Sequence, residues 1–213
     1  MKDIVIFGAR GMGKEVALLI ENINYYNNTW NILGFIDDDP AYNEVKKIFR
    51  YPFLGSSDWF ETNNNEVFVA IAIGKGQVRK KVHEKLLRYE MIEFAILVDP
   101  SVRVDQTVSL GIGSIICRNC TVTVDTIIGK SVLMNTGASV GHDSILGDYC
   151  TLLTNSIIAG HTILGECCEV GSGAFVLQGK TVIANTIIAP LSSILRNITE
   201  AGTYVGNPAR RMI

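Results

Sequence analysis

The sequence has no large excess of charge of either sign, no long apolar run and no cysteine framework. Its 213 residues carry 19 Lys and Arg against 21 Asp and Glu, without a basic block, which disfavours a nucleic-acid-binding protein. The opening apolar run, residues 4–7, is far too short for a signal peptide or a membrane span, so no membrane partner is expected. Five Cys without framework spacing are expected to be reduced thiols in a cytoplasmic protein.

Apolar residues, by contrast, are abundant. Hydrophobic residues make up 47% of the chain and charged residues 19%, and the mean hydropathy is +0.25. This composition excludes an intrinsically disordered chain, because enough apolar surface is present to build a core. The length corresponds to one large domain or two small ones.

Apolar residues, sixteen of them aliphatic and one Met, recur at every sixth position from Val98 to Ile194, seventeen times without an insertion. The next position is often Gly, and the fifth position of each hexapeptide is usually small. A period of six is neither a helical period nor simple strand alternation, and it predicts a parallel β-helix. Three hexapeptides would close one triangular coil of 18 residues, with the aliphatic side chains pointing inward and the small residues under the corners.

Residues 1–95 have a different pattern. Short apolar strands at residues 3–7, 32–36 and 67–73 alternate with two amphipathic helices, which predicts a small parallel sheet of Rossmann type. We therefore expect two domains, residues 1–95 and residues 96–213, the second ending in a tail outside the repeat. The second helix carries His83 among five basic residues, and this basic face is expected to be solvated.

Three glycines, Gly8, Gly11 and Gly13, form a turn between the first strand and the first helix. Such a turn suits a phosphate, because backbone N–H groups and the helix N-terminus point at it. Asp37 and Asp38 follow the second strand and Gly74 closes the third, at the edge where such sheets bind ligands. The alternatives are a turn needed only for packing and a solvated acidic turn.

Two of the three histidines lie in the repeat. His142 is expected to point outward from a corner, and Asp143 beside it is suited to fix the imidazole tautomer and raise its basicity. The alternative is an incidental surface pair. Cys120, Cys150 and Cys168 occupy small inward positions, whereas Cys167 is expected to face outward. No metal is predicted, because a zinc carbonic anhydrase on this fold would need a third histidine in the repeat.

Five segments together carry a family resemblance. They are residues 6–16 (IFGARGMGKEV), 34–38 (GFIDD), 70–74 (AIAIG), 135–143 (NTGASVGHD) and 205–209 (VGNPA). The chain resembles, over its whole length, the hexapeptide-repeat sugar acyltransferases. This family includes sialic acid O-acetyltransferases and N-acetyltransferases of UDP- and GDP-linked amino sugars. The resemblance implies an α/β Rossmann-like N-terminal domain followed by a left-handed parallel β-helix, assembled as a homotrimer.

The resemblance also implies roles for individual residues. His142 would be the general base and Asp143 its support, and the backbone N–H of Gly160 would stabilise the oxyanion. Acetyl-CoA would be a co-substrate, with no permanently bound cofactor, and would run past Thr151 and Ser172. Asn135 would lie near the acceptor amine. The nucleotide part of the acceptor would contact Arg10, Gly11, Met12, Asp37, Asp38 and Gly74.

The chain departs from the family pattern at three positions. Many members have His where this sequence has Met12, and some have His at Thr151 or Asn at His161. The implied activity is acetyl transfer to the amine of a nucleotide-linked amino sugar. The alternatives are O-acetylation of sialic acid or another sugar hydroxyl, and nucleotide-sugar binding without catalysis. A homotrimer also agrees with the low charge around His142 and with Leu133, Ile145 and Ile157 in outward positions.

Overall fold

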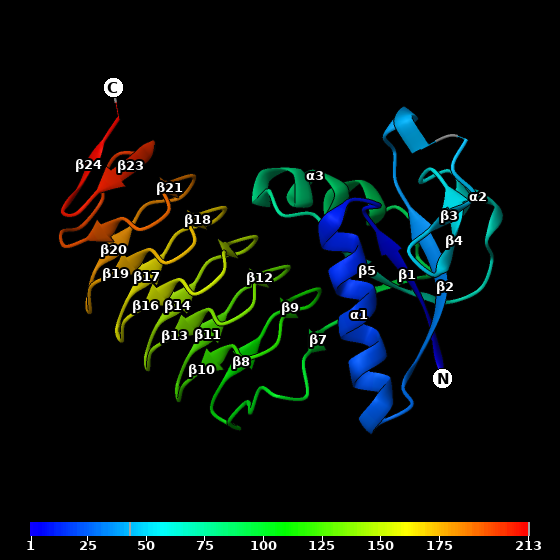
Figure 1. Ribbon diagram of the computed structural model, residues 1–213, viewed down its shortest axis with the longest axis horizontal. Coiled ribbons are helices and arrows are strands. Elements are labelled where there is room, and N and C mark those ends of the chain that lie inside the picture. Colours follow the sequence, from blue (N-terminus) through cyan, green and yellow to red (C-terminus); the bar gives the residue numbers. More distant parts are fainter. Residues whose placement is uncertain (43, 213) are drawn as a thin grey trace.

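The computed structural model describes residues 1–42 and 44–212, which form an α/β part and a triangular prism of short strands (Figure 1). The α/β part is a six-stranded sheet in the order β3-β4-β2-β1-β5-β6, in which only the β3–β4 pair is antiparallel. Its elements are β1 (Lys2–Phe7), α1 (Gly11–Tyr26), β2 (Trp30–Ile36), the 3-10 turn at Pro40–Tyr42, β3 (Lys47–Ile48), β4 (Tyr51–Gly55), α2 (Trp59–Thr62), β5 (Val67–Ile71), α3 (Gly76–Leu86) and β6 (Ile92–Phe94).

The glycines at the β1–α1 turn are required by close backbone packing. Gly8 has φ +116°, a conformation that side chains other than glycine rarely adopt. A Cβ on Gly13 would collide with the carbonyl oxygen of Gly8, and one on Gly8 would lie 2.8 Å from the carbonyl oxygen of Ala72. The turn therefore brings the ends of β1 and β5 and the first turn of α1 into direct contact. This contact lies at the carboxyl edge of the sheet, where a ligand is expected in folds of this kind.

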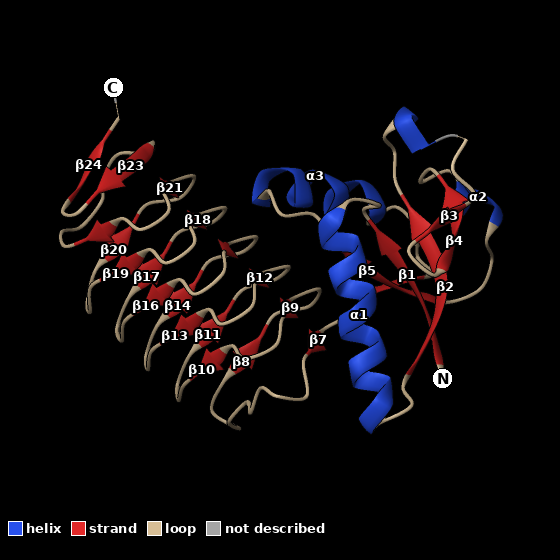
Figure 2. Ribbon diagram, in the orientation of Figure 1, coloured by secondary structure: helices blue, strands red, loops and turns tan. Residues whose placement is uncertain are grey.

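The prism contains sixteen strands of two residues each, and Figure 2 shows them as a regular stack. The strands are β7 (Leu97–Val98), β8 (Ser109–Leu110), β9 (Ile115–Ile116), β10 (Thr121–Val122), β11 (Ile127–Ile128), β12 (Leu133–Met134), β13 (Ser139–Val140), β14 (Ile145–Leu146), β15 (Thr151–Leu152), β16 (Ile157–Ile158), β17 (Ile163–Leu164), β18 (Glu169–Val170), β19 (Phe175–Val176), β20 (Thr181–Val182), β21 (Ile187–Ile188) and β22 (Ser193–Ile194). Each pairs in parallel with the strand 18 residues away, as Ile128 does with Leu146, which confirms the predicted coil length.

Three sheets form the faces of the prism, and we name each face after its first strand. The β8 face contains β8, β11, β14, β17 and β20, and the β10 face contains β10, β13, β16, β19 and β22. The β7 face contains β7, β9, β12, β15, β18 and β21, and the hairpin of β23 (Thr203–Gly206) and β24 (Ala209–Arg211) extends it. The repeated aliphatic residues form one continuous core inside, except that Val104 belongs to the repeat but lies in no strand.

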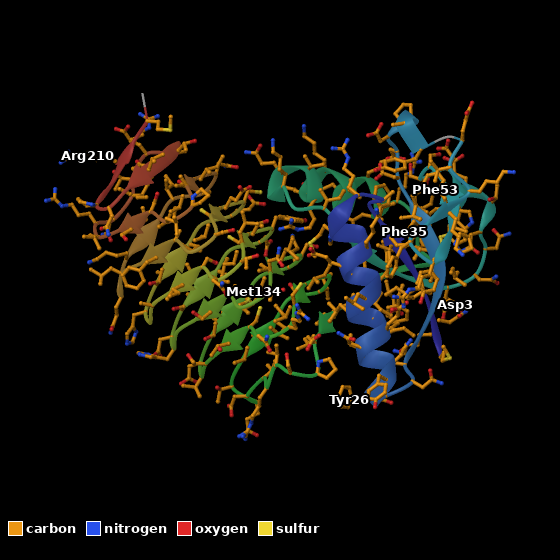
Figure 3. All side chains as sticks on the ribbon, viewed as in Figure 1. Asp3, Tyr26, Phe35, Phe53, Met134 and Arg210 are labelled. Carbon is orange, nitrogen blue, oxygen red and sulfur yellow. The ribbon has the colours of Figure 1, made fainter. Side chains whose placement is uncertain are left out.

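The α/β part packs on the β7 face at its first coils. Leu97, Ile115 and Leu133 point out of this face and are buried in the same apolar cluster as α1 and β1. In Figure 3, Phe35 and Phe53 lie within the α/β part, Met134 lies in the prism and Arg210 lies at its far end. Leu133 is therefore covered by this chain itself, and its predicted role in a contact between subunits is wrong.

Helix α3 lies over the corner between the β8 and β7 faces, and its basic residues differ from the sequence prediction (Figure 1). Arg79 and His83 are buried, with exposed fractions of 1% and 2%. His83 stacks on Phe94 with ring centroids 3.9 Å apart, and its Nδ1 lies 2.9 Å from Oγ of Ser131. Cys167 is also buried, because the start of α3 at Gly76 covers its backbone. The expectation of a solvated basic face was wrong at these positions, since the prism supplies a second wall.

These observations confirm the predicted combination of a Rossmann-like sheet and a hexapeptide β-helix. Within residues 1–42 and 44–212, no helix has the length and apolarity needed to cross a membrane.

Candidate active site

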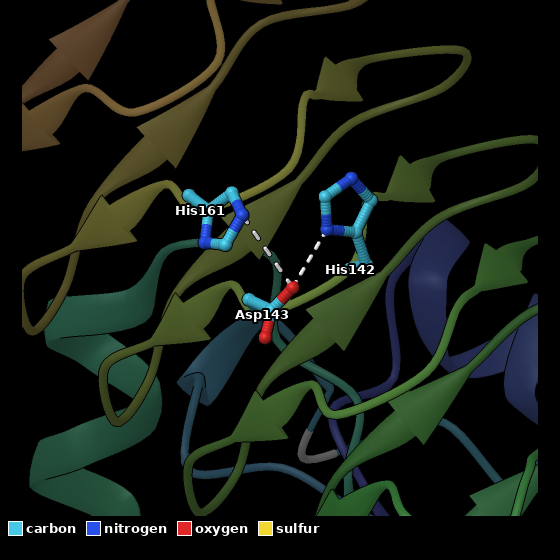
Figure 4. Close-up of side chains that lie close together, drawn as sticks. All are labelled: His142, Asp143 and His161. Carbon is cyan, nitrogen blue, oxygen red and sulfur yellow. Dashed lines mark hydrogen bonds and ion pairs between the residues drawn. The ribbon is translucent and has the colours of Figure 1, made fainter.

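His142 and Asp143 lie together at the corner that joins the β10 face to the β8 face, between β13 and β14 (Figure 4). Nδ1 of His142 lies 2.7 Å from Oδ2 of Asp143. A carboxylate can only accept, so Nδ1 carries the proton and donates it. This hydrogen bond leaves Nε2 of His142 with a free lone pair, and both side chains are close to half exposed. The pair is therefore arranged as a general base oriented by a carboxylate.

Gly160 and His161 occupy the same corner one coil further on. A Cβ on Gly160 would lie 2.7 Å from Nε2 of His142, so the absence of a side chain at Gly160 makes room for the imidazole. The backbone N–H of His161 donates to the carbonyl oxygen of His142 over 2.8 Å. Nε2 of His161 lies 3.6 Å from Oδ2 of Asp143, so two histidines flank one carboxylate.

The backbone N–H of Gly160, a buried residue at this corner, differs from those of its neighbours in its hydrogen bonding. Its neighbours Ala159 and His161 donate to Val176 and His142, whereas the Gly160 N–H has no acceptor among the residues that the structure describes. A free N–H beside a basic imidazole is what an oxyanion site requires.

Apart from Asn135, the predicted acceptor residues meet at the carboxyl edge of the α/β sheet, but several carboxylates there already have protein partners. Oδ2 of Asp37 accepts the backbone N–H of Ala9 over 2.8 Å, which ties the glycine turn to β2. Asp38 accepts from the Ser57 backbone N–H and from Nζ of Lys85. Burial raises the pKa of Asp38, but the hydrogen bonds from Ser57 and Lys85, together with the positive charge of Lys85, outweigh it and hold that pKa below its ordinary value.

Arg10, Gly11, Met12 and Gly74 border the same edge. Nη2 of Arg10 pairs with Oδ2 of Asp39 over 2.8 Å, and its side chain is 77% exposed. Gly11 is exposed and has open space where a side chain would project, whereas Met12 packs in part against the core. The carbonyl oxygen of Gly74 accepts hydrogen bonds from Thr151 and Arg79. Arg10 and Gly11 are therefore the predicted acceptor residues with the most open surroundings.

The predicted acetyl-CoA residues do not lie together in one chain. Thr151 is on the β7 face and is 1% exposed, and its hydroxyl donates to the Gly74 carbonyl over 2.6 Å. The α/β part covers it, so acetyl-CoA cannot run past Thr151 as predicted. Ser172 is exposed at the corner between the β7 and β10 faces. Asn135 lies at that corner too, half-buried, with its Oδ1 held by the N–H of Thr136.

Sequence reasoning missed Arg79, which links the acceptor edge to the prism. Its guanidinium donates to carbonyl oxygens of Ile73 and Gly74 on one side and of Ser131, Tyr149 and Cys150 on the other. Burial lowers the pKa of Arg79 to about 10, so it remains charged at neutral pH. The sequence signal for the covered face was the apolar column Leu97, Ile115 and Leu133, spaced by one coil.

Comparison with known proteins places these features in a family context. Residues 3–86 match the family model of the PglD N-terminal domain. No match to a curated protein was found. Among solved structures, PerB from Caulobacter crescentus, determined with CoA and GDP-perosamine, is 28% identical with a TM-score of 0.86, covering 99% of this chain and 97% of its own.

Two further structures span the chain. WeeI from Acinetobacter baumannii is 25% identical with a TM-score of 0.88, covering 99% of each chain. The acetyltransferase domain of PglB from Neisseria gonorrhoeae is 24% identical with a TM-score of 0.90, covering 100% of each. The resemblance to the hexapeptide-repeat sugar acyltransferases is confirmed. The predictions of an acyltransferase and of a left-handed β-helix are confirmed with it.

Proposed function

We propose that this acyltransferase transfers the acetyl group of acetyl-CoA to the amine of a nucleotide-linked amino sugar, with His142 as general base. The observation that carries the proposal is the hydrogen bond of 2.7 Å from Nδ1 of His142 to Asp143, which leaves Nε2 free to accept a proton. The relatives support the substrate class, because PerB was solved with CoA and GDP-perosamine and PglB with acetyl coenzyme A. The free thiols of the five cysteines agree with a reaction in the cytoplasm.

The chemistry needs few protein groups, because a thioester is already activated. The amine nitrogen attacks the thioester carbonyl carbon while Nε2 of His142 removes the proton of the amine, a contribution of typically about 10²–10⁴-fold. The N–H of Gly160 is suited to hold the negative charge that develops on the carbonyl oxygen. Collapse of the intermediate breaks the C–S bond and releases CoA as its thiolate, which takes up a proton. Asp143 holds His142 in the reactive tautomer.

The site requires a neighbouring subunit, which leads us to include a homotrimer in the proposal. In a triangular coil, the corner that carries His142 is opposite the β7 face, and the α/β part packs on that face. One chain therefore cannot bring its own acceptor edge to its own His142. Outward-pointing Ile127, Ile145 and Ile163 form a column on the adjoining β8 face and are 39–49% exposed, which supports a protein contact there.

The activity is tested by following thiol release from acetyl-CoA with UDP-, GDP- and dTDP-linked amino sugars, alongside the matching sugars that carry a hydroxyl in place of the amine. We expect turnover with one of the amines only, and faster turnover with hydroxyl acceptors would favour O-acetylation instead. His142→Asn should lower kcat by about 10² or more with unchanged circular dichroism, and Asp143→Asn should lower it less. Near-normal turnover of folded His142→Asn would contradict the assigned base.

Assembly is tested by sedimentation of the wild type and of Ile145→Asp. The wild type should sediment as a trimer, whereas Ile145→Asp, which places a charge in the exposed column, should sediment as a folded monomer without activity. Ile187→Asp, an equally exposed isoleucine at the far end of the β7 face, is the control. A wild-type monomer with full activity would refute the trimer.

A further inference from the structure

The corner that carries His142 gathers the ligand set of a transition-metal site. His142, Asp143 and His161 each offer one ligand atom, and these three atoms all lie within 4.8 Å of one another. Figure 4 shows the two imidazoles on either side of the Asp143 carboxylate. Among the residues that the structure describes, this is the one group of three His, Cys, Asp or Glu side chains close enough to hold an ion.

The backbone holds these three residues in place. Asp143 and His161 stack one coil apart, and both have the left-handed corner conformation, with φ +58° and +55°. Both residues are therefore oriented by the same corner geometry and project from the same edge of the prism. Hydrogen bonds from the Asp143 N–H to Val124 and from the His161 N–H to His142 join the three coils that form this edge.

The separations fit a small divalent ion. Ligand atoms bound to tetrahedral zinc at about 2.0–2.1 Å lie about 3.3 Å apart. Here Oδ2 of Asp143 lies 2.7 Å from Nδ1 of His142 and 3.6 Å from Nε2 of His161, so shifts of a few tenths of an ångström bring these two pairs to that separation. The ligand atoms of the two histidines lie within 4.8 Å of each other, and a turn of the exposed imidazoles brings them closer. Two imidazoles and one carboxylate suit Zn²⁺, Co²⁺ or Ni²⁺ rather than Mg²⁺, which prefers oxygen ligands and water.

We infer that His142, Asp143 and His161 form a site for a zinc-class divalent ion, and that its occupation switches the transferase off. The second statement rests on the proposed function. A neutral imidazole has one N–H, so an ion on Nδ1 of His142 forces the proton onto Nε2. The lone pair that would accept the proton of the amine is then lost. The side chains are 44–56% exposed, which leaves room for water as the remaining ligands and for removal of the ion by a chelator.

Binding is measured first, by calorimetry with Zn²⁺ and by the visible absorption of Co²⁺, on full-length protein freed of metal and of any purification tag. We expect one ion per chain. His161→Asn should weaken binding at least about tenfold, which corresponds to about 1.4 kcal/mol. Asn tolerates the left-handed backbone at position 161, so this variant should fold. It also keeps all five cysteines, which separates the corner site from binding by thiols.

Asp125→Asn is the matched control, because Asp125 is an exposed carboxylate at the same corner position one coil before Asp143. It should bind Zn²⁺ as the wild type does, and Mg²⁺ should bind to none of the proteins. The absence of saturable Zn²⁺ binding, or equal binding by His161→Asn, would overturn the site. This result does not depend on any activity, so it stands even if the acceptor sugar is of another kind.

Inhibition is measured second, in the thiol-release assay. Micromolar Zn²⁺ should abolish wild-type turnover and a chelator should restore it. Inhibition is expressed as a fraction of each protein's own metal-free turnover, and His161→Asn should need at least about tenfold more Zn²⁺ for the same fractional inhibition. Zn²⁺ that binds at the corner while turnover continues would overturn the switch. Inactivity of metal-free wild type with every acceptor would count against the proposed function instead.

Discussion

Arg79 is expected to be the main polar connection between the α/β part and the prism, and its replacement by Met tests this role. Met keeps an unbranched side chain and removes the guanidinium. The carbonyl oxygens of Ser131, Tyr149 and Ile73 then lose their donor, and no other hydrogen bond reaches them from the described residues. The carbonyl oxygen of Cys150 still accepts a hydrogen bond from the N–H of Leu133, and the carbonyl oxygen of Gly74 still accepts one from the hydroxyl of Thr151.

The magnitude follows from the buried acceptors. Ser131 and Tyr149 are 0% and 2% exposed, and each buried acceptor without a donor costs about 1–3 kcal/mol. Two such acceptors give about 2–6 kcal/mol, reduced by the desolvation cost of the guanidinium that the variant no longer bears. We expect a net loss of about 3 kcal/mol. For a chain of this length, that lowers Tm by about 6–12 °C.

Thermal unfolding followed by circular dichroism at neutral pH measures the effect. Arg79→Lys, which keeps the charge with fewer donors, should fall between wild type and Arg79→Met. The control is Arg88→Met, because the Arg88 side chain is 54% exposed in its ion pair with Glu61, and such pairs contribute about 0–1 kcal/mol. Arg79→Met within about 1 kcal/mol of wild type, with an unchanged spectrum, would refute the reasoning.

Three further predictions concern the site and its support. Gly160→Ala should lower kcat at least about tenfold with little change in Tm, because its Cβ would displace the end of the His142 ring and not the backbone; kinetics beside thermal melts measure both. Burial and Lys130 hold the pKa of His83 below its ordinary value, so the folded state favours the neutral ring, and stability should fall as the pH drops below about 6.5. His83→Gln should lose less Tm than wild type between pH 7.5 and 5.5, and an equal loss would contradict this cause. Arg10→Met should raise the KM of the acceptor and leave that of acetyl-CoA unchanged; equal changes in both would count against a divided site.

The prism was predictable from sequence because its period is local. Each aliphatic residue of the repeat packs into the interior that its own coil encloses. Val140 and Leu146 can therefore be assigned to the interior without information on contacts with distant parts of the chain. The strands and the glycine turn of the α/β part were predictable for the same reason. His142 and Asp143 are neighbours in sequence, and their pairing also needed no tertiary information.

The face that the α/β part covers was not predictable from the hexapeptide alone. Thr151 and Ile145 occupy the same position of the repeat, yet Thr151 is 1% exposed and Ile145 is 39% exposed. The difference arises because residues six apart lie on different faces, whereas residues 18 apart share one face. Arg79 and His83 were misassigned for a related reason. Their polarity favoured solvent, but at the prism corner carbonyl oxygens accept from Arg79, and the hydroxyl of Ser131 forms a hydrogen bond with Nδ1 of His83.

The position of His142 is one at which the residue type can vary without disturbing the packed interior of the coil. Inward residues are restricted to aliphatic side chains, and outward strand residues are available for covering domains or subunits. The exposed corner residues His142 and Asp143 belong to neither core, so reactive side chains can be placed there at little cost in stability. One coil supplies the imidazole and its carboxylate as neighbours, and the next coil supplies the small residue and the free N–H at Gly160. The proposed base and the proposed oxyanion donor therefore come from two successive coils, which places them 18 residues apart in the sequence.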